Sequence, residues 1–244
     1  MPPNWDYQCQ RVFAFSGAIG IVFCLSAWEV FWPQPPNFAM SAQQTAQFYA
    51  DHQSGFLIGV TLTAIGMPFL MAWDIQLGAM LRKLEGGQGL VTTVATVGIT
   101  TIPILLAFDC AVWGVAAYRP LETSPDVTRA LSDVAWISSM LIWPPLCAGM
   151  ILVGIVILKT RHLAGGFPTW LGWFSIFVGL VEPGQAGIIF DKTGLFAPNG
   201  LGSWYLAVFT WGPWIVFMSI AQARILTREK AGAKGQDSVL APSA

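Results

Sequence analysis

Six long apolar segments constrain the fold of this chain more than any other feature of its sequence. Each is long enough to cross the hydrocarbon core of a bilayer, which takes about 20 residues of α-helix. Unpaired backbone groups are costly in hydrocarbon, so such segments fold as helices. The sequence therefore predicts an all-α, polytopic integral membrane protein, a six-helix transmembrane bundle with spans near residues 11–32, 55–81, 90–117, 129–158, 169–190 and 203–225.

The composition leaves little room for a soluble domain. Of the 244 residues, 55% are apolar and only 10% are charged, whereas soluble domains carry about 25% charged residues. We therefore assign residues 1–226 to a single six-span domain and 227–244 to a disordered cytoplasmic tail. The outer loop 33–54 contains Ser41 and Gln44 at capping-box spacing, which predicts a short interfacial helix. That helix is either a connector or a lid over an outer cavity.

The basic residues are distributed unevenly between the two sides of the predicted bundle. If the N-terminus is cytoplasmic, nine of the 12 lysines and arginines fall on the cytoplasmic side and three fall in outer loops. This asymmetry follows the positive-inside rule and predicts that both termini are cytoplasmic. The net charge of −1 gives no electrostatic reason to expect nucleic acid as a partner. The expected partner is the lipid bilayer.

Prolines lie near the middle of five of the six segments. They are Pro68, Pro103, the pair Pro144 and Pro145, Pro183, and Pro213. A proline inside a helix removes one backbone hydrogen bond and clashes with the preceding turn, so we expect spans two to six to be kinked. In hydrocarbon, neighbouring groups or a polar cavity must satisfy the freed carbonyls. The prolines therefore predict a site among spans three to six.

Five acidic residues fall within the predicted spans, and two of them, Asp109 and Glu182, lie deep and at similar depth. The other three lie nearer the membrane surfaces: Glu29 and Asp133 on the outer side and Asp74 toward the inner side. Charged side chains at such positions are costly and are usually functional or paired. Glu182 directly precedes Pro183, so the helix is expected to break beside the acid. We predict six ligand-binding residues around these breaks: Asp109, Glu182, Gln185, Trp143, Trp211 and Trp214. The alternative is that the acids only fix helix packing and that the tryptophans fill space beside the prolines.

Cofactor sites and histidine-based metal sites are not expected, and a carboxylate-only site for a hard cation stays open. His52 lies in the predicted outer loop and His162 on the predicted inner side, so the two histidines cannot share a metal ion. No lysine lies in the middle of a span, which argues against a retinal Schiff base, and the hydrolase motif Gly-x-Ser-x-Gly is absent.

Three short motifs carry a resemblance to other proteins. They are Ser41-Ala-x-x-x-Ala-x-Phe-Tyr49, the acid-Val-Ala-Trp segment at 133–136, and Gly-Leu-Phe-Ala-Pro-Asn-Gly at 194–200. Together they resemble a family of bacterial multi-span inner-membrane proteins with no assigned activity. The resemblance implies a location in the bacterial inner (cytoplasmic) membrane and implies no catalytic residue.

Three functions fit these features. The first, which is not enzymatic, is binding or passage of a small, largely apolar molecule through a midplane pocket formed by spans three to six. The second is an accessory or structural subunit of a larger complex or a homo-oligomer, with Gly17, Gly20 and Gly78 as docking faces. The third is a membrane-embedded isomerase or cyclase in which Asp109 and Glu182 are the catalytic acid and base.

Overall fold

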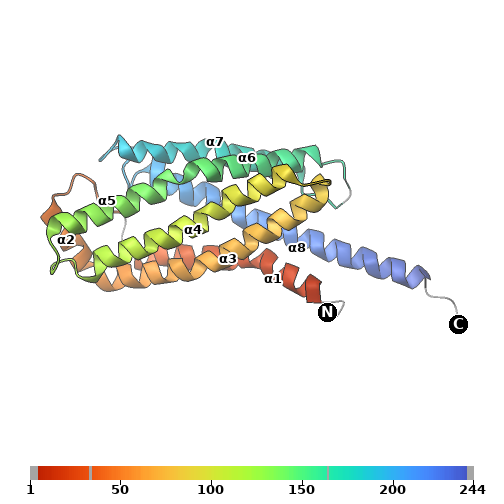
Figure 1. Ribbon diagram of the computed structural model, residues 1–244, viewed down its shortest axis with the longest axis horizontal. Helices are drawn as coiled ribbons and strands as arrows, with labels where there is room; N and C mark the ends of the chain where they lie inside the picture. Colours follow the sequence, from red (N-terminus) through yellow and green to blue (C-terminus); the bar gives the residue numbers. More distant parts are fainter. Residues whose placement is uncertain (1–4, 33–34, 164, 241–244) are drawn as a thin grey trace.

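The computed structural model describes residues 5–32, 35–163 and 165–240, and within these ranges the chain is helical with no β-strand (Figure 1). The elements in chain order are α1 (Trp5–Ser26), η1 (Ala27–Phe31), α2 (Ala42–Asp51), α3 (Gln53–Glu85), α4 (Leu90–Tyr118), α5 (Pro125–Leu141), α6 (Trp143–Lys159), α7 (Thr169–Val181), η2 (Glu182–Ile189), η3 (Leu201–Tyr205) and α8 (Leu206–Leu240). Here η1 and η3 are π-helical turns and η2 is a 3₁₀-helix.

Five helical stretches are long and apolar enough to cross a membrane: 6–31, 53–85, 90–118, 125–159 and 201–232. The surface of the bundle is apolar as well. On α4, for example, Val97, Phe108 and Val115 each expose more than 60% of their surface, while Ile99 and Leu106 on the same helix are buried. A helix that is apolar on all sides belongs in hydrocarbon or in a large core. The protein is therefore an all-helical, multi-pass membrane protein.

The segment 169–190 does not form one long α-helix. It consists of α7, with 13 residues, followed directly by η2, with eight. The change occurs beside Pro183, which has no N–H to donate and whose ring disturbs the turn before it. In Figure 1, α7 lies alongside α6. Their glycines explain the close approach, since a Cβ atom on Gly154 would lie 2.5 Å from the carbonyl oxygen of Gly172.

The other prolines have different local effects. Pro68, Pro103 and Pro213 lie inside the continuous helices α3, α4 and α8. Pro144 and Pro145 instead occupy the first turn of α6, directly after Ile142 separates α6 from α5. Prolines are tolerated there because the first N–H groups of a helix have no partner within it. The chain therefore leaves α-helical geometry at two of the five proline positions.

Glycines predicted to form docking faces are used inside the bundle. A Cβ atom on Gly17 or Gly20 of α1 would meet Trp73 or Leu70 of α3, and one on Gly78 of α3 would meet Thr96 of α4. These positions are therefore occupied by neighbouring helices of the same chain. The three glycines allow α1, α3 and α4 to approach one another closely, as small residues do in membrane bundles.

The helix expected after Ser41 is present as α2, with the reciprocal capping box between Ser41 and Gln44. The side-chain hydroxyl of buried Tyr49 forms a 3.0 Å hydrogen bond with Ser132, which ties α2 to α5.

The tail predicted to be disordered from Thr227 is helical as far as Leu240, because α8 continues through it. Arg, Glu, Lys and Ala at 228–231 favour helix, and extending an existing helix needs no new nucleation. The last four residues of the predicted tail lie outside the described residues. The first turns of α1 and the last turns of α8 lie at the same end of the bundle (Figure 1).

Candidate functional site

A cavity of about 70 Å³ lies where several helices meet. By volume it accommodates several water molecules or part of a small organic molecule. Its walls are mostly apolar or aromatic, and Ser139, Glu182 and Gln185 add polar groups. The full lining is Trp28, Ile102, Leu106, Trp113, Ser139, Met140, Ile142, Trp143, Leu146, Glu182, Gln185, Trp204, Val208 and Trp211.

The three described segments with helical but not α-helical geometry all reach this cavity. The π-helical turn η1 carries Trp28, the π-helical turn η3 carries Trp204, and the 3₁₀-helix η2 carries Glu182 and Gln185. The break between α5 and α6 also lies there, since both Ile142 and Trp143 line the cavity. π-helical turns within helices are frequent at functional sites.

Glu182 is fully buried at the junction of α7 and η2. Gln185, one turn later, donates its side-chain N–H to Oε2 of Glu182, and Thr210 of α8 donates its hydroxyl to Oε1. Both carboxyl oxygens therefore have a partner, and the two bonds join η2 to α8. Each carboxylate oxygen has two acceptor positions, so Glu182 can accept further hydrogen bonds from the cavity.

Five tryptophans pack together in a tryptophan cluster: Trp28, Trp32, Trp113, Trp136 and Trp204. Three of them, Trp28, Trp113 and Trp204, line the cavity. Trp32 is central to the cluster, with ring centroids 4.7 Å from Trp113, 5.6 Å from Trp136 and 6.5 Å from Trp204. Trp28 packs edge-on against Trp204 at 5.3 Å. Edge-on geometries such as those of Trp32–Trp113, Trp32–Trp204 and Trp28–Trp204 are favourable for aromatic rings. The contacts within the cluster therefore hold the lining tryptophans in place.

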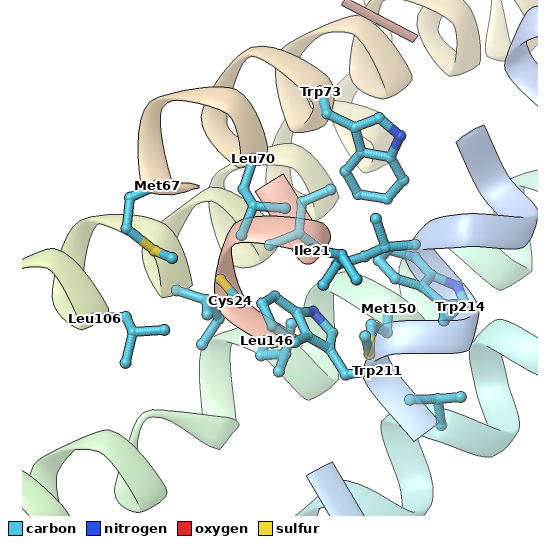
Figure 2. Close-up of a cluster of buried hydrophobic side chains, with 14 of the residues drawn as sticks. Ile21, Cys24, Met67, Leu70, Trp73, Leu106, Leu146, Met150, Trp211 and Trp214 are labelled. Atoms are coloured by element: carbon cyan, nitrogen blue, oxygen red, sulfur yellow. The ribbon is translucent and has the colours of Figure 1, made fainter. Parts of the chain in front are cut away.

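Trp143 and Trp211, both predicted from the sequence to belong to one site, also line the cavity. Figure 2 shows Trp211 beside Leu146, a further lining residue. Trp214, by contrast, does not line the cavity. Its indole N–H donates to the hydroxyl of Ser175 at 2.9 Å, and its ring packs edge-on against Trp73 at 5.4 Å. Trp214 therefore has the packing role of the alternative interpretation.

Asp109 is buried but does not line the cavity. Its Oδ1 accepts a 2.5 Å hydrogen bond from the hydroxyl of Ser138, and its Oδ2 has no partner. Ser138 neighbours the lining residue Ser139, and Trp113 lies one turn from Asp109 on α4. The structure thus brings Glu182, Gln185, Trp143 and Trp211 to one cavity, and it places Asp109 and Trp214 outside the lining.

The loop between η2 and η3 connects two segments that contribute to the site. The carboxylate of Asp191 accepts backbone N–H groups from Thr193, Gly194 and Phe196. These bonds, the one from Phe196 first, hold the pKa of Asp191 below its ordinary value of 3.8. Phe196 in turn packs on Gly187 of η2 and Gly202 of η3. The loop therefore joins the two segments that carry Glu182 and Trp204.

Among the described residues, no group of three or more His, Cys, Asp or Glu side chains is arranged to hold a metal ion. The cavity itself contains one acidic side chain and no histidine or cysteine in its lining. What this lining offers is aromatic surface, one carboxyl group, one amide and one hydroxyl.

No model of a protein family, no curated protein sequence and no solved structure matches the chain. The resemblance to a bacterial membrane family, suggested by the three motifs, therefore stays a prediction, and the function has to be inferred from the residues themselves.

Sequence reasoning missed several residues of the site. Trp28 and Trp204 lie at the ends of predicted spans, where tryptophans normally anchor helices at the membrane interface, yet both line the cavity. Trp113 and Thr210 have neither an acidic residue nor a proline directly beside them in the sequence that would mark them as part of a site. Their roles depend on which side of each helix faces the bundle.

Proposed function

We propose that the protein binds or passes a small, largely apolar molecule through the cavity around Glu182. The observation that carries this proposal is the convergence of three irregular helical segments and one buried carboxyl group on a cavity with mostly apolar walls. Ligand sites typically combine a largely apolar lining with a few well-placed polar groups that orient the ligand. Glu182, Gln185 and Ser139 are the polar groups of this lining.

We also propose six membrane crossings, with α7 and η2 together forming the fifth. The α-helix rises about 1.5 Å per residue and the 3₁₀-helix about 2.0 Å. Thirteen residues of α7 and eight of η2 then extend about 36 Å, against a hydrocarbon core of about 30 Å. With six crossings, the nine-to-three distribution of basic residues favours cytoplasmic termini. The proposed location in a bacterial inner membrane rests on the resemblance of the three motifs. The proposed site begins near the midplane at Glu182 and extends toward Trp28 and Trp204 at the outer ends of their spans.

The two other functions have less support. A free docking surface built from Gly17, Gly20 and Gly78 is not available, since these glycines contact neighbouring helices. An isomerase or cyclase with two catalytic acids needs both in one cavity, and Asp109 is absent from the lining that contains Glu182. Asp109 has its own partner in Ser138. Binding through Glu182 alone requires neither feature.

Occlusion of the cavity tests the proposal. Ser139 lines the cavity, and its hydroxyl bonds only to a carbonyl of its own helix, that of Trp136 at 3.0 Å. Ser139→Leu adds bulk to the lining, whereas Ser139→Ala removes the hydroxyl without adding bulk. The probe is 3,3-dimethylbutan-1-ol, a small and mostly hydrocarbon molecule. Its binding to protein in nanodiscs is measured by saturation-transfer NMR, with empty nanodiscs as the background.

We expect the probe to bind the wild type and Ser139→Ala and to lose most of its signal with Ser139→Leu. Circular dichroism checks that all three proteins have the same helical content. The proposal is contradicted if the wild type gives no signal above that of empty nanodiscs, either with this probe or with a cationic probe of the same shape. An equal signal from Ser139→Leu and the wild type contradicts it as well, because the probe would then bind elsewhere.

A further inference from the structure

The charges around the cavity are unbalanced. Glu182 is fully buried and is the one acidic side chain in the lining, which contains no lysine, arginine or histidine. No described basic residue forms an ion pair with it, since its two oxygens accept from the neutral groups Gln185 and Thr210. A buried carboxylate without a cation is strongly unfavourable. The site therefore favours an occupant that brings a positive charge.

The walls around Glu182 suit such an occupant. Five tryptophans from five different elements line the same cavity: Trp28 of η1, Trp113 of α4, Trp143 of α6, Trp204 of η3 and Trp211 of α8. The face of an indole ring carries negative electrostatic potential and attracts cations, and cages of aromatic rings are a recurring way to bind quaternary ammonium groups. Tryptophan is the strongest of the aromatic side chains in this interaction.

We propose that the ligand of this cavity is a compact organic cation, an amine or quaternary ammonium group on an apolar body, held by Glu182 and by the faces of the surrounding tryptophans. The inference rests on the proposed function and names the ligand class of the same cavity. Anionic ligands are disfavoured because they would meet the carboxyl group of Glu182 in a lining without basic side chains. Uncharged ligands fit the apolar walls but leave Glu182 without a counterion.

The bonds that Glu182 already makes are compatible with this role. Gln185 and Thr210 each donate one hydrogen bond and hold the carboxyl group in place. A quaternary ammonium group has no N–H to donate, so it needs proximity to the carboxylate and to aromatic faces but no free acceptor position. A protonated amine uses one of the acceptor positions that remain on the two oxygens.

A pair of matched probes separates the charge of the ligand from its shape. Choline and 3,3-dimethylbutan-1-ol have nearly the same shape, but choline has a positively charged nitrogen where the alcohol has a carbon atom. Binding of both is titrated on the full-length protein in nanodiscs of uncharged lipid by saturation-transfer NMR. We expect the wild type to bind choline about tenfold or more tightly than the alcohol, which is the size of effect that desolvated cation–π contacts produce.

Two substitutions test the part played by the carboxyl group. Glu182→Gln should remove the preference for choline, so that the protein binds the two probes with similar affinity. Glu29→Gln is the matched control, because Glu29 lies next to Trp28 on η1 but is exposed and does not line the cavity. This control should keep the preference. If Glu182→Gln does not fold, Trp143→Leu serves instead: it should weaken binding of choline several-fold more than it weakens binding of the alcohol.

The outcomes separate the two proposals. Equal affinity of the wild type for choline and the alcohol overturns the cation assignment and leaves the proposed function standing. A preference for choline that survives in Glu182→Gln, or in Trp143→Leu where Glu182→Gln does not fold, also overturns it, since the cation would then bind without the groups named here. If neither probe binds above the background of empty nanodiscs, the proposed function itself fails.

Discussion

The crossing of α4 and α6 beside the cavity provides the sharpest test of how this bundle is packed. The two helices meet at Gly98 and Gly149 with their backbones in contact. A Cβ atom on Gly98 would lie 2.5 Å from the carbonyl oxygen of Pro145, 3.0 Å from Cα of Gly149 and 3.1 Å from its nitrogen. All three are backbone atoms, so no side-chain rotation can relieve the contact. We therefore predict that Gly98→Ala destabilises the protein.

The size of the effect follows from the distances. Ordinary contact begins at 3.4 Å, so the helices must separate locally by up to 3.4 − 2.5 = 0.9 Å. Overpacking of this kind destabilises a protein by about 1–3 kcal/mol, while the higher helix propensity of alanine stabilises it by at most about 1 kcal/mol. Because three backbone atoms are involved, we expect a net loss of about 1–2 kcal/mol. In a chain of this length that lowers the Tm by about 2–8 °C.

A control lies on the same helix. The nearest atom to a Cβ on Gly114 is Cγ2 of Val60, at 4.0 Å, so Gly114→Ala meets no obstacle. This change should stabilise the protein by about 0.5–1 kcal/mol through the lower flexibility of alanine, and raise the Tm by about 1–4 °C. Both variants and the wild type are heated at one scan rate in one detergent, with near-ultraviolet circular dichroism as the signal.

The two variants should move the Tm in opposite directions. If Gly98→Ala is as stable as the wild type, or more stable, the close backbone contact between α4 and α6 is refuted. Such a result would also change the account of the cavity, because Leu106 of α4 and Leu146 of α6 form parts of its wall.

Two further predictions concern α2 and the loop near Asp191. Tyr49→Phe removes the hydrogen bond to Ser132 and should lower the free energy of unfolding by about 1 kcal/mol, measured by thermal unfolding. Tyr118→Phe is the control, because Tyr118 is exposed and should tolerate the change. Equal effects of the two substitutions would contradict the hydrogen bond between α2 and α5. Backbone N–H groups of the loop after η2 lower the pKa of Asp191 from 3.8. The ionised Asp191 therefore stabilises this loop fully well above pH 3.8, and the stabilisation of the loop declines as the pH falls below that value. Pepsin cleavage at Leu195–Phe196 should therefore accelerate below about pH 4, and unchanged rates relative to an unstructured peptide would refute this role of Asp191.

Much of the local structure can be predicted from short stretches of sequence. The capping box of Ser41 and Gln44 places the start of α2 correctly, because both partners lie within one turn. Pro183 marks the end of regular α-helix at Glu182 for an equally local reason. The tail after Thr227 was predicted wrongly as disordered, since its charged residues also suit a continued helix and α8 had already been nucleated.

The candidate site could be predicted only in part. Glu182, Gln185, Trp143 and Trp211 lie close to prolines in the sequence, which predicts their place in a site, and they line one cavity. Asp109, like Glu182, is an acidic residue within a predicted span, yet its carboxyl group accepts a hydrogen bond from Ser138 outside the cavity lining. The difference lies in which side of α4 carries the aspartate relative to α5. Residues 109 and 138 are far apart in sequence, and no local pattern links them.

The sequence by itself determined that this protein is helical, that it belongs in a membrane, and where several helices begin or break. Those properties depend on hydrophobicity, proline and capping over a few neighbouring residues. The tertiary structure alone decided which tryptophans surround the cavity and which glycines hold helices together. In a soluble helix an apolar stripe identifies the buried side, whereas here Val97 faces outward and Ile99 faces inward on the same apolar helix. Because both sides of a membrane helix are apolar, its rotation, and therefore the membership of the site, is set by packing against the other helices.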